Sequence, residues 1–224
     1  MNVPFTSEQF FNVFTQYNQA IWPIQILLYL AGIAALGLAV WKFKVSDRII
    51  AAILAGLWLR MGIVYHLTFF TSINKAAYLF GGLFIVQGVL FFIVGTLRHK
   101  LSFQPHSNLY AITGAFFILY GTLIYPALGY FMGHIYPHAP TFGVPCPTTI
   151  FTFGLLLWTD RKVPKYLLVI PMLWAVIGLS AAIQWGVLED IMLLLAGLIA
   201  TTMLVYRDKT QDETQKEAAP SLSA

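Results

Sequence analysis

The only cysteine of the chain, Cys146, stands between Pro145 and Pro147, directly before the apolar residues 147–159. Proline fixes φ, and the residue before a proline avoids helical geometry, so we expect a helix to begin at about Pro147. Cys146 would then be the N-cap residue, where free N–H groups and the helix dipole favour an anion, including a thiolate. Such a thiol can act as a soft-metal ligand, as a redox group, or simply as a small buried residue that caps a helix.

Three histidines are further candidates for metal binding. His134 and His138 lie in a polar loop before Cys146, and His66 lies near the end of an apolar segment. Imidazole and thiolate groups together suit Zn, Cu or another soft metal ion. One hypothesis is therefore a soft-metal site made by these three histidines and Cys146, and the alternative is that they are ordinary polar loop and interface residues.

Arg60 is predicted to lie inside an apolar segment, about 20 Å from its cytoplasmic edge. A charge at that depth costs some 2.5 kcal/mol or more. No Asp or Glu is expected inside a span to pair with it, because Glu189 and Asp190 are interpreted as charges at a helix N-terminus. Partners for Arg60 are therefore expected among backbone carbonyls, water, an anionic ligand and neutral polar side chains. The candidate substrate-binding residues are Arg60, Cys146, Gln87 and Tyr29, with Tyr120 as a further possible partner of the arginine.

The composition indicates which class of protein must position these residues. Of 224 residues, 58% are hydrophobic and only 10% are charged, which indicates an integral membrane protein rather than a soluble one. The net charge of +4 comes from short basic clusters between apolar segments, so it does not indicate nucleic-acid binding. Phosphate-loop, dinucleotide and serine-hydrolase motifs are absent from the sequence.

Seven apolar segments are expected to form an all-α transmembrane domain over residues 21–206. Of the 13 Lys and Arg residues, all but Arg60 and Lys75 lie in alternate loops or in the C-terminal tail. By the positive-inside rule the N-terminus is outside and the C-terminus is cytoplasmic, which needs an odd number of crossings. The predicted spans are residues 21–41, 49–70, 76–97, 109–131, 147–159, 166–185 and 188–206.

Residues outside this domain are expected to form two further regions. In residues 1–20, Thr6 and Gln9 make a capping box, and Phe10, Phe14 and Tyr17 recur at helical spacing. This pattern predicts an amphipathic helix on the outer surface. Residues 207–224 are charged and are predicted to be a disordered cytoplasmic tail.

The fifth predicted span is too short to cross a bilayer as a helix. From Pro147 to Asp160 a helix covers about 20 Å of the roughly 30 Å of hydrocarbon. Extended chain over residues 139–146 must cover the rest, and such backbone is tolerated only beside protein or a wet cavity. We therefore expect a recess that is open to the outside at Cys146.

A weak internal repeat accompanies these spans. Gly-Leu-x-x-Trp occurs at residues 37–41 and again at 154–158, and Leu-Trp-x-x-x-Gly occurs at residues 57–62 and 173–178. The nearly constant offset predicts a parallel repeat of three plus one plus three helices. Parallel repeats of this kind are found in transporters.

The motifs Phe-Thr-Ser-Glu-Gln-Phe-Phe at residues 5–11 and Phe-Gly-Val-Pro-Cys-Pro-Thr-Thr-Ile-Phe-Thr-Phe-Gly at residues 142–154 carry a family resemblance. With them, the chain resembles a family of bacterial multi-pass membrane proteins classed as a domain of unknown function. The resemblance covers about residues 4–206. It implies a multi-pass protein of the inner membrane and implies no activity.

Three functions remain open from the sequence. The leading hypothesis is a transporter or binding protein for a small solute or metal ion, which would act in the bilayer through an outward-facing recess. The second is a membrane enzyme or redox protein that uses Cys146, and the third is an assembly subunit without a site. The cofactor, beyond a possible soft metal ion, and the oligomeric state are left open.

Overall fold

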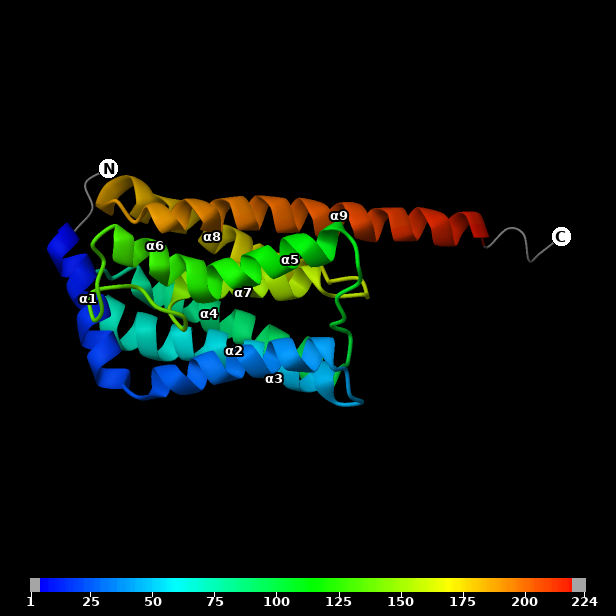
Figure 1. Ribbon diagram of the computed structural model, residues 1–224, viewed down its shortest axis with the longest axis horizontal. Helices are drawn as coiled ribbons and strands as arrows, with labels where there is room; N and C mark the ends of the chain where they lie inside the picture. Colours follow the sequence, from blue (N-terminus) through cyan, green and yellow to red (C-terminus); the bar gives the residue numbers. More distant parts are fainter. Residues whose placement is uncertain (1–4, 219–224) are drawn as a thin grey trace.

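The computed structural model describes residues 5–218, and its regular elements over that range are all helices (Figure 1). Segments of π-helix at Met61–Phe69, Phe92–Leu97 and Tyr120–Ile124 continue three of the helices, and short 3₁₀ turns lie at Phe70–Ser72 and Leu188–Asp190. The α-helices are α1 (Ser7–Ile21), α2 (Ile24–Val40), α3 (Ser46–Arg60), α4 (Ala77–Phe91), α5 (Leu109–Leu119), α6 (Tyr125–Phe131), α7 (Pro145–Leu157), α8 (Tyr166–Trp185) and α9 (Ile191–Ala218).

The prediction of an all-helical chain with several membrane-compatible helices is confirmed. Within the described residues, five helices are long and apolar enough to cross a membrane, or six if α1 and α2, which meet at a bend of 88°, are taken as one broken span. The five run over Ser46–Ser72, Ala77–Leu97, Leu109–Phe131, Tyr166–Trp185 and Leu188–Thr214. The first four coincide closely with predicted apolar segments, because length and hydropathy alone define such helices, while the fifth begins as predicted but continues beyond residue 206.

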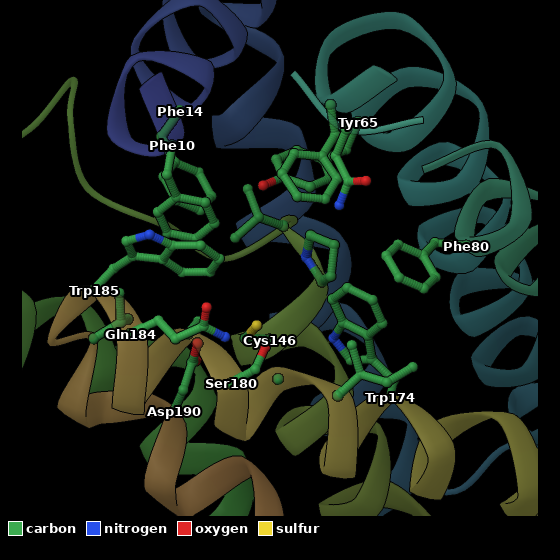
Figure 2. Close-up of a pocket in the computed structure, with 18 of the residues that line it drawn as sticks. Phe10, Phe14, Tyr65, Phe80, Cys146, Trp174, Ser180, Gln184, Trp185 and Asp190 are labelled. Atoms are coloured by element: carbon green, nitrogen blue, oxygen red, sulfur yellow. The ribbon is translucent and has the colours of Figure 1, made fainter. Parts of the chain in front are cut away.

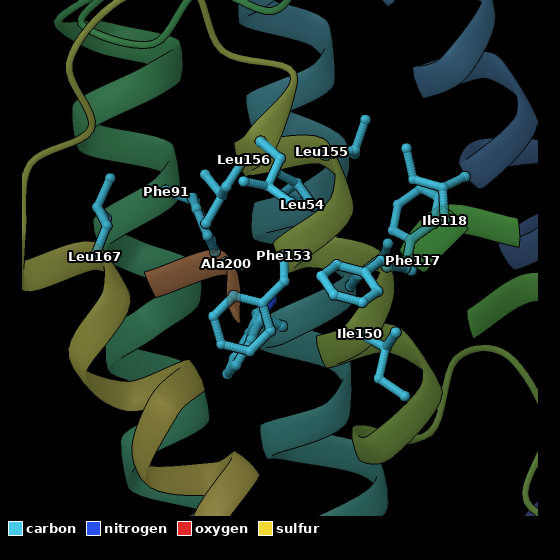
Figure 3. Packing of buried hydrophobic residues seen from close by; sticks show 14 of the residues in the cluster. Leu54, Phe91, Phe117, Ile118, Ile150, Phe153, Leu155, Leu156, Leu167 and Ala200 are labelled. Carbon is cyan, nitrogen blue, oxygen red and sulfur yellow. The ribbon is translucent and has the colours of Figure 1, made fainter. Parts of the chain in front are cut away.

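Helix α7 forms the centre of the bundle. Of its 13 residues, all except Cys146 are buried. Its side chains Ile150, Phe153 and Leu156 lie among apolar side chains of the surrounding helices (Figure 3). At about 1.5 Å per residue the helix is about 20 Å long, so it is the short helix that the sequence predicts.

Helices α5 and α7 approach each other closely at a pair of glycines. A Cβ atom built on Gly114 would lie 2.7 Å from the carbonyl oxygen of Gly154, and one on Gly154 would lie 2.7 Å from that of Gly114. Small residues at such crossings allow backbones to come into contact, which is how helices associate in an apolar environment. This contact fixes α7 against α5.

Helix α1 lies across one end of the bundle (Figure 1). The predicted capping box is confirmed. The backbone N–H of Gln9 donates to Thr6 Oγ1 at 3.2 Å, and the backbone N–H of Thr6 donates to Gln9 Oε1 at 2.9 Å. The aromatic face, including Phe10, Phe14 and Tyr17, is buried against the bundle. The periodicity that predicts the helix therefore also marks its contact with the other helices.

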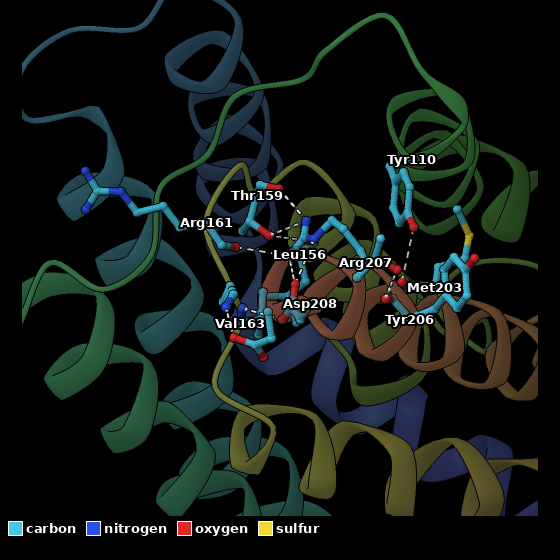
Figure 4. Close-up of polar contacts among 12 residues, drawn as sticks. Tyr110, Leu156, Thr159, Arg161, Val163, Met203, Tyr206, Arg207 and Asp208 are labelled. Atoms are coloured by element: carbon cyan, nitrogen blue, oxygen red, sulfur yellow. Dashed lines mark hydrogen bonds and ion pairs between the residues drawn. The ribbon is translucent and has the colours of Figure 1, made fainter. Parts of the chain in front are cut away.

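The structure differs from the predicted disordered tail. Residues 207–218 continue α9 as a helix that extends beyond the bundle, while residues 219–224 lie outside the described range (Figure 1). Arg207 donates to the carbonyl oxygens of Thr159 and Arg161, and Asp208 accepts a hydrogen bond from the Val163 amide at 3.0 Å (Figure 4). These contacts come from a loop that is distant in the sequence, so composition alone does not reveal them.

Candidate functional site

Helix α7 begins earlier than predicted. Its N-cap is Val144, with φ −94° and ψ 165°, and Pro145 and Pro147 both lie in its first turn. The first turn of a helix leaves its N–H groups without helical partners, so proline is tolerated there. Cys146 is therefore the second helical residue rather than the N-cap, which corrects the position predicted from the proline rule.

The chain before α7 is held by specific contacts. Gly143 has a φ of +102°, and a Cβ atom on it would lie 2.3 Å from Leu28 Cδ1, so both its conformation and its surroundings require glycine. The Gly143 amide donates to Thr148 Oγ1 at 2.9 Å. Thr149 Oγ1 donates to the Pro145 carbonyl at 2.7 Å. The threonines therefore fix the turn that positions Cys146.

A cavity of about 150 Å³ lies at this end of the bundle, and Cys146 forms part of its wall (Figure 2). Cys146 is only partly buried, unlike the other residues of α7. The cavity lies between α1, the second half of α8 and the start of α9, with aromatic side chains on several sides. The sequence predicts a recess at Cys146, and the structure contains a cavity at that place.

Aromatic side chains of α1 and α8 cover the cavity. The rings of Phe10 and Trp185 are stacked with centroids 4.5 Å apart, and Phe5 stacks on Trp185 at 4.9 Å. On the other side of α1, Phe14 stacks on Tyr65 at 5.7 Å. Aromatic pairs in such geometries add to the energy of apolar burial. Helix α1 is thereby attached to the bundle as the cover of the cavity.

Asp190 is the acidic group of the cavity. It lies in the turn that starts α9, and its side chain is directed toward the space beside Gln184 and Cys146 (Figure 2). The Tyr125 hydroxyl donates to Asp190 Oδ1 at 2.6 Å. The Cys146 thiol is a second hydrogen-bonding neighbour of the same carboxyl group. Among the described residues, the cavity thus combines aromatic walls with one carboxyl group.

Arg60 does not line this cavity. Its guanidinium group donates a hydrogen bond to the Tyr17 hydroxyl and lies over the Tyr17 ring, 5.3 Å from the centroid. The Tyr17 hydroxyl in turn donates to the Gly143 carbonyl at 3.1 Å. A tyrosine partner was predicted for Arg60, but this one belongs to α1, which the sequence places outside the spans. Arg60 therefore connects α3, α1 and the chain before α7.

The other two predicted substrate-binding residues lie elsewhere. Gln87 is fully buried in α4 and donates to the Leu167 carbonyl at 3.0 Å, while its Oε1 atom has no partner within the described residues. Tyr29 packs on Phe142 with ring centroids 5.3 Å apart, beside a separate surface depression. Of the four predicted residues, only Cys146 lines the cavity.

The structure does not assemble the predicted metal site. Nδ1 of His134 lies 3.0 Å from Glu189 Oε1, and Nδ1 of His138 lies 2.7 Å from Thr15 Oγ1. His66 is fully buried among aromatic rings, and neither ring nitrogen has a hydrogen-bond partner among residues 5–218. Over the described part of the chain, no three His, Cys, Asp or Glu side chains form a group that could hold a metal ion.

Sequence reasoning missed the acidic and indole groups of the cavity. The sequence places Asp190 at a helix N-terminus, where the structure also has it, and assigns no role to Trp174 or Trp185. Asp190 was visible as an ionisable residue at the start of an apolar segment. The tryptophans carry no such signal, because only the fold brings Phe10 of α1 onto Trp185 and Phe80 of α4 onto Trp174.

The helices and the cavity define a multi-helical protein of membrane-compatible composition with a small internal cavity. The chain belongs to the family of unknown function DUF6064, whose profile matches residues 7–215. The resemblance to a family of unknown function is thus confirmed. No curated protein and no solved structure matches the chain.

Proposed function

We propose that the chain is a seven-span protein of the inner membrane that binds a small solute in an outward-facing cavity, as a transporter or a solute-binding protein. The observation that carries the proposal is the cavity of about 150 Å³ at Cys146, beneath α1. Ligand sites are typically concave and mostly apolar, with a few polar groups that fix orientation. This cavity has that character.

The distribution of charge supports the outward orientation. Lys42 donates to Ser102 and lies 3.5 Å from Asp47 and 3.9 Å from Asp160, so the loops before α3, α5 and α8 meet at one end of the bundle. The loops at this end are rich in Lys and Arg, whereas the cavity lies at the opposite end, beneath α1 (Figure 1). By the positive-inside rule the cavity end faces outward.

The short α7 supports a broken seventh crossing. It is buried by its neighbours along its length, and non-helical chain leads into it from the cavity end. Discontinuous helices of this kind form binding sites in transporters, where irregular backbone is surrounded by protein. The parallel arrangement of three plus one plus three helices belongs to the same proposal.

Labelling of Cys146 from one side of the membrane tests the proposal. Because the chain has a single cysteine, a membrane-impermeant thiol reagent reports on this position alone. We expect the thiosulfonate reagent MTSET to modify the protein in right-side-out vesicles and not in inside-out vesicles. Modification from the cytoplasmic side only would contradict the proposed function.

A matched pair of variants shows whether the reagent enters through the cavity. Ser180 lines the cavity, whereas Thr202 is exposed on the outside of α9. We expect Ser180→Leu to slow the modification of Cys146 by about tenfold or more, because it fills the space, and Thr202→Leu to leave the rate unchanged. Equal rates in the two variants would show that the cavity is not the route.

A further inference from the structure

The charge of the cavity restricts what it can bind. Among the described residues that line it, Asp190 is the only Asp, Glu, Lys, Arg or His. Arg60, the arginine among the predicted substrate-binding residues, donates a hydrogen bond to Tyr17 instead. An anionic ligand would thus enter a space that contains a carboxyl group and no cation, which is unfavourable by Coulomb's law at low dielectric.

Asp190 itself lacks a cationic partner among the described residues. Its side chain is 1% exposed, and its polar neighbours are the Tyr125 hydroxyl and the Cys146 thiol, which are neutral donors. The neighbouring histidine, His134, is paired with Glu189. A buried carboxylate is costly unless a positive charge compensates it, and the N-terminus of α9 supplies only a partial one. The site therefore has room for a cation.

The walls around this carboxyl group are aromatic. Trp174, Tyr65 and Phe80 lie on one side of the cavity and Phe10 and Trp185 on the other (Figure 2). The faces of such rings attract cations, most strongly where the contact is desolvated. Trp174 is 8% exposed, and its ring lies against Phe80 and Phe84 with centroids 5.5 and 5.0 Å away. The walls around the carboxyl group therefore suit a ligand with a positive charge and an apolar part.

We propose that the cavity binds a compact organic cation, such as a primary or quaternary ammonium compound, with its nitrogen beside Asp190 and its apolar part against the aromatic walls. The volume of the cavity suits a small organic cation, because a cavity of about 150 Å³ accommodates a molecule of roughly the size of benzene. The inference rests on the proposed solute-binding function and names its ligand class.

A series of three ligands of one shape tests the inference on the wild-type chain. Benzylammonium, benzyl alcohol and benzoate are nearly isosteric and differ in charge. We expect calorimetric titration of the full chain, purified in detergent, to give an affinity for benzylammonium about tenfold or more above that for benzyl alcohol, with no measurable binding of benzoate. Equal affinities of the cation and the alcohol, preference for benzoate, or no binding of benzylammonium would overturn the inference.

Substitution of the two neighbouring carboxyl groups shows whether the preference comes from Asp190. Asp190→Asn keeps the shape and an oxygen acceptor for Tyr125, and we expect it to weaken benzylammonium binding about tenfold while benzyl alcohol binds as before. Glu189→Gln is the matched control, because Glu189 does not line the cavity, and its effect should stay within about twofold. A larger loss in Glu189→Gln than in Asp190→Asn would overturn the assignment.

The ligand class and the function can fail separately. Binding of benzyl alcohol as tight as that of benzylammonium would remove the preference for cations and leave a small-solute cavity in place. Failure of MTSET to reach Cys146 from outside would instead remove the outward-facing function, whichever charge the cavity prefers.

Discussion

Arg60 on α3 donates a hydrogen bond to the hydroxyl of Tyr17 on α1, and that hydroxyl donates at 3.1 Å to the Gly143 carbonyl. One tyrosine thus connects the cover of the cavity to a partly buried arginine and to the chain that precedes α7. Arg60 lies within the stretch Ser46–Ser72, which is long and apolar enough to cross a membrane, and a charge in such surroundings is costly without a partner. Arg60 therefore acts in the attachment of α1 and not as a ligand of the cavity.

Tyr17→Phe should loosen this attachment. The substitution keeps the ring under the guanidinium group but removes the hydroxyl, so Arg60 and the Gly143 carbonyl each lose a partner. We expect a loss of about 1–3 kcal/mol in the free energy of unfolding and faster alkylation of Cys146. Tyr130→Phe is the control, since Tyr130 is 59% exposed, and it should change neither quantity.

Gly114→Ala should separate α5 from α7. Its Cβ atom would lie 2.7 Å from the Gly154 carbonyl oxygen and 2.6 Å from Trp158 Cδ1, so the helices must move apart. We expect destabilisation of about 1–3 kcal/mol, seen as a lower midpoint of thermal unfolding in detergent. Gly56→Ala, where a Cβ atom meets nothing within 4 Å, should instead stabilise the protein by up to about 1 kcal/mol. Similar midpoints for the two variants would contradict the close packing of α5 and α7.

Cys146→Ser distinguishes a binding wall from a reactive thiol. Serine is similar in size and keeps a hydroxyl donor beside Asp190, so affinity for benzylammonium should stay within about threefold of wild type. A membrane enzyme or redox protein that uses Cys146 would lose its turnover completely in this variant. Loss of all binding in Cys146→Ser would contradict the role of the thiol as part of the wall.

Asp208→Ala should free the extension of α9. It removes the acceptor of the Val163 amide and a partner of Arg207, which together attach residues 207 and 208 to the loop before α8. Hydrogen exchange should become faster over residues 205–214, while Glu213→Ala, at an exposed position, should have no effect on residues 205–208. Unchanged exchange in Asp208→Ala would mean that these contacts do not hold the helix.

Local features of the fold were predictable from the sequence. The capping box of Thr6 and Gln9 follows from short-range pattern and the bounds of four long helices follow from hydropathy, and the structure confirms them, whereas α9 continues beyond the predicted end at residue 206. The start of α7 was misplaced by two residues, because Pro147 falls in the first turn, where its missing N–H group costs nothing.

Which side chains surround the cavity depends on contacts between residues far apart in the sequence, so these side chains were less predictable. His134 pairs with Glu189, 55 positions later, and Asn18 of α1 donates to the carbonyl oxygen of Ala139, 121 positions later. No local pattern indicates that α1 covers the cavity, that Arg60 donates a hydrogen bond to Tyr17, or that Asp190 lies beside Cys146. The sequence located a recess at Cys146, and the fold supplied the groups around it.

The measurement that tests the central claim most directly is the rate of Cys146 alkylation by N-ethylmaleimide at increasing concentrations of benzylammonium. If the cation occupies the space beside Cys146 and Asp190, the rate should fall along a saturable curve, and the Asp190→Asn variant should need about tenfold more ligand for the same protection. An alkylation rate that stays constant up to saturating benzylammonium would contradict the account.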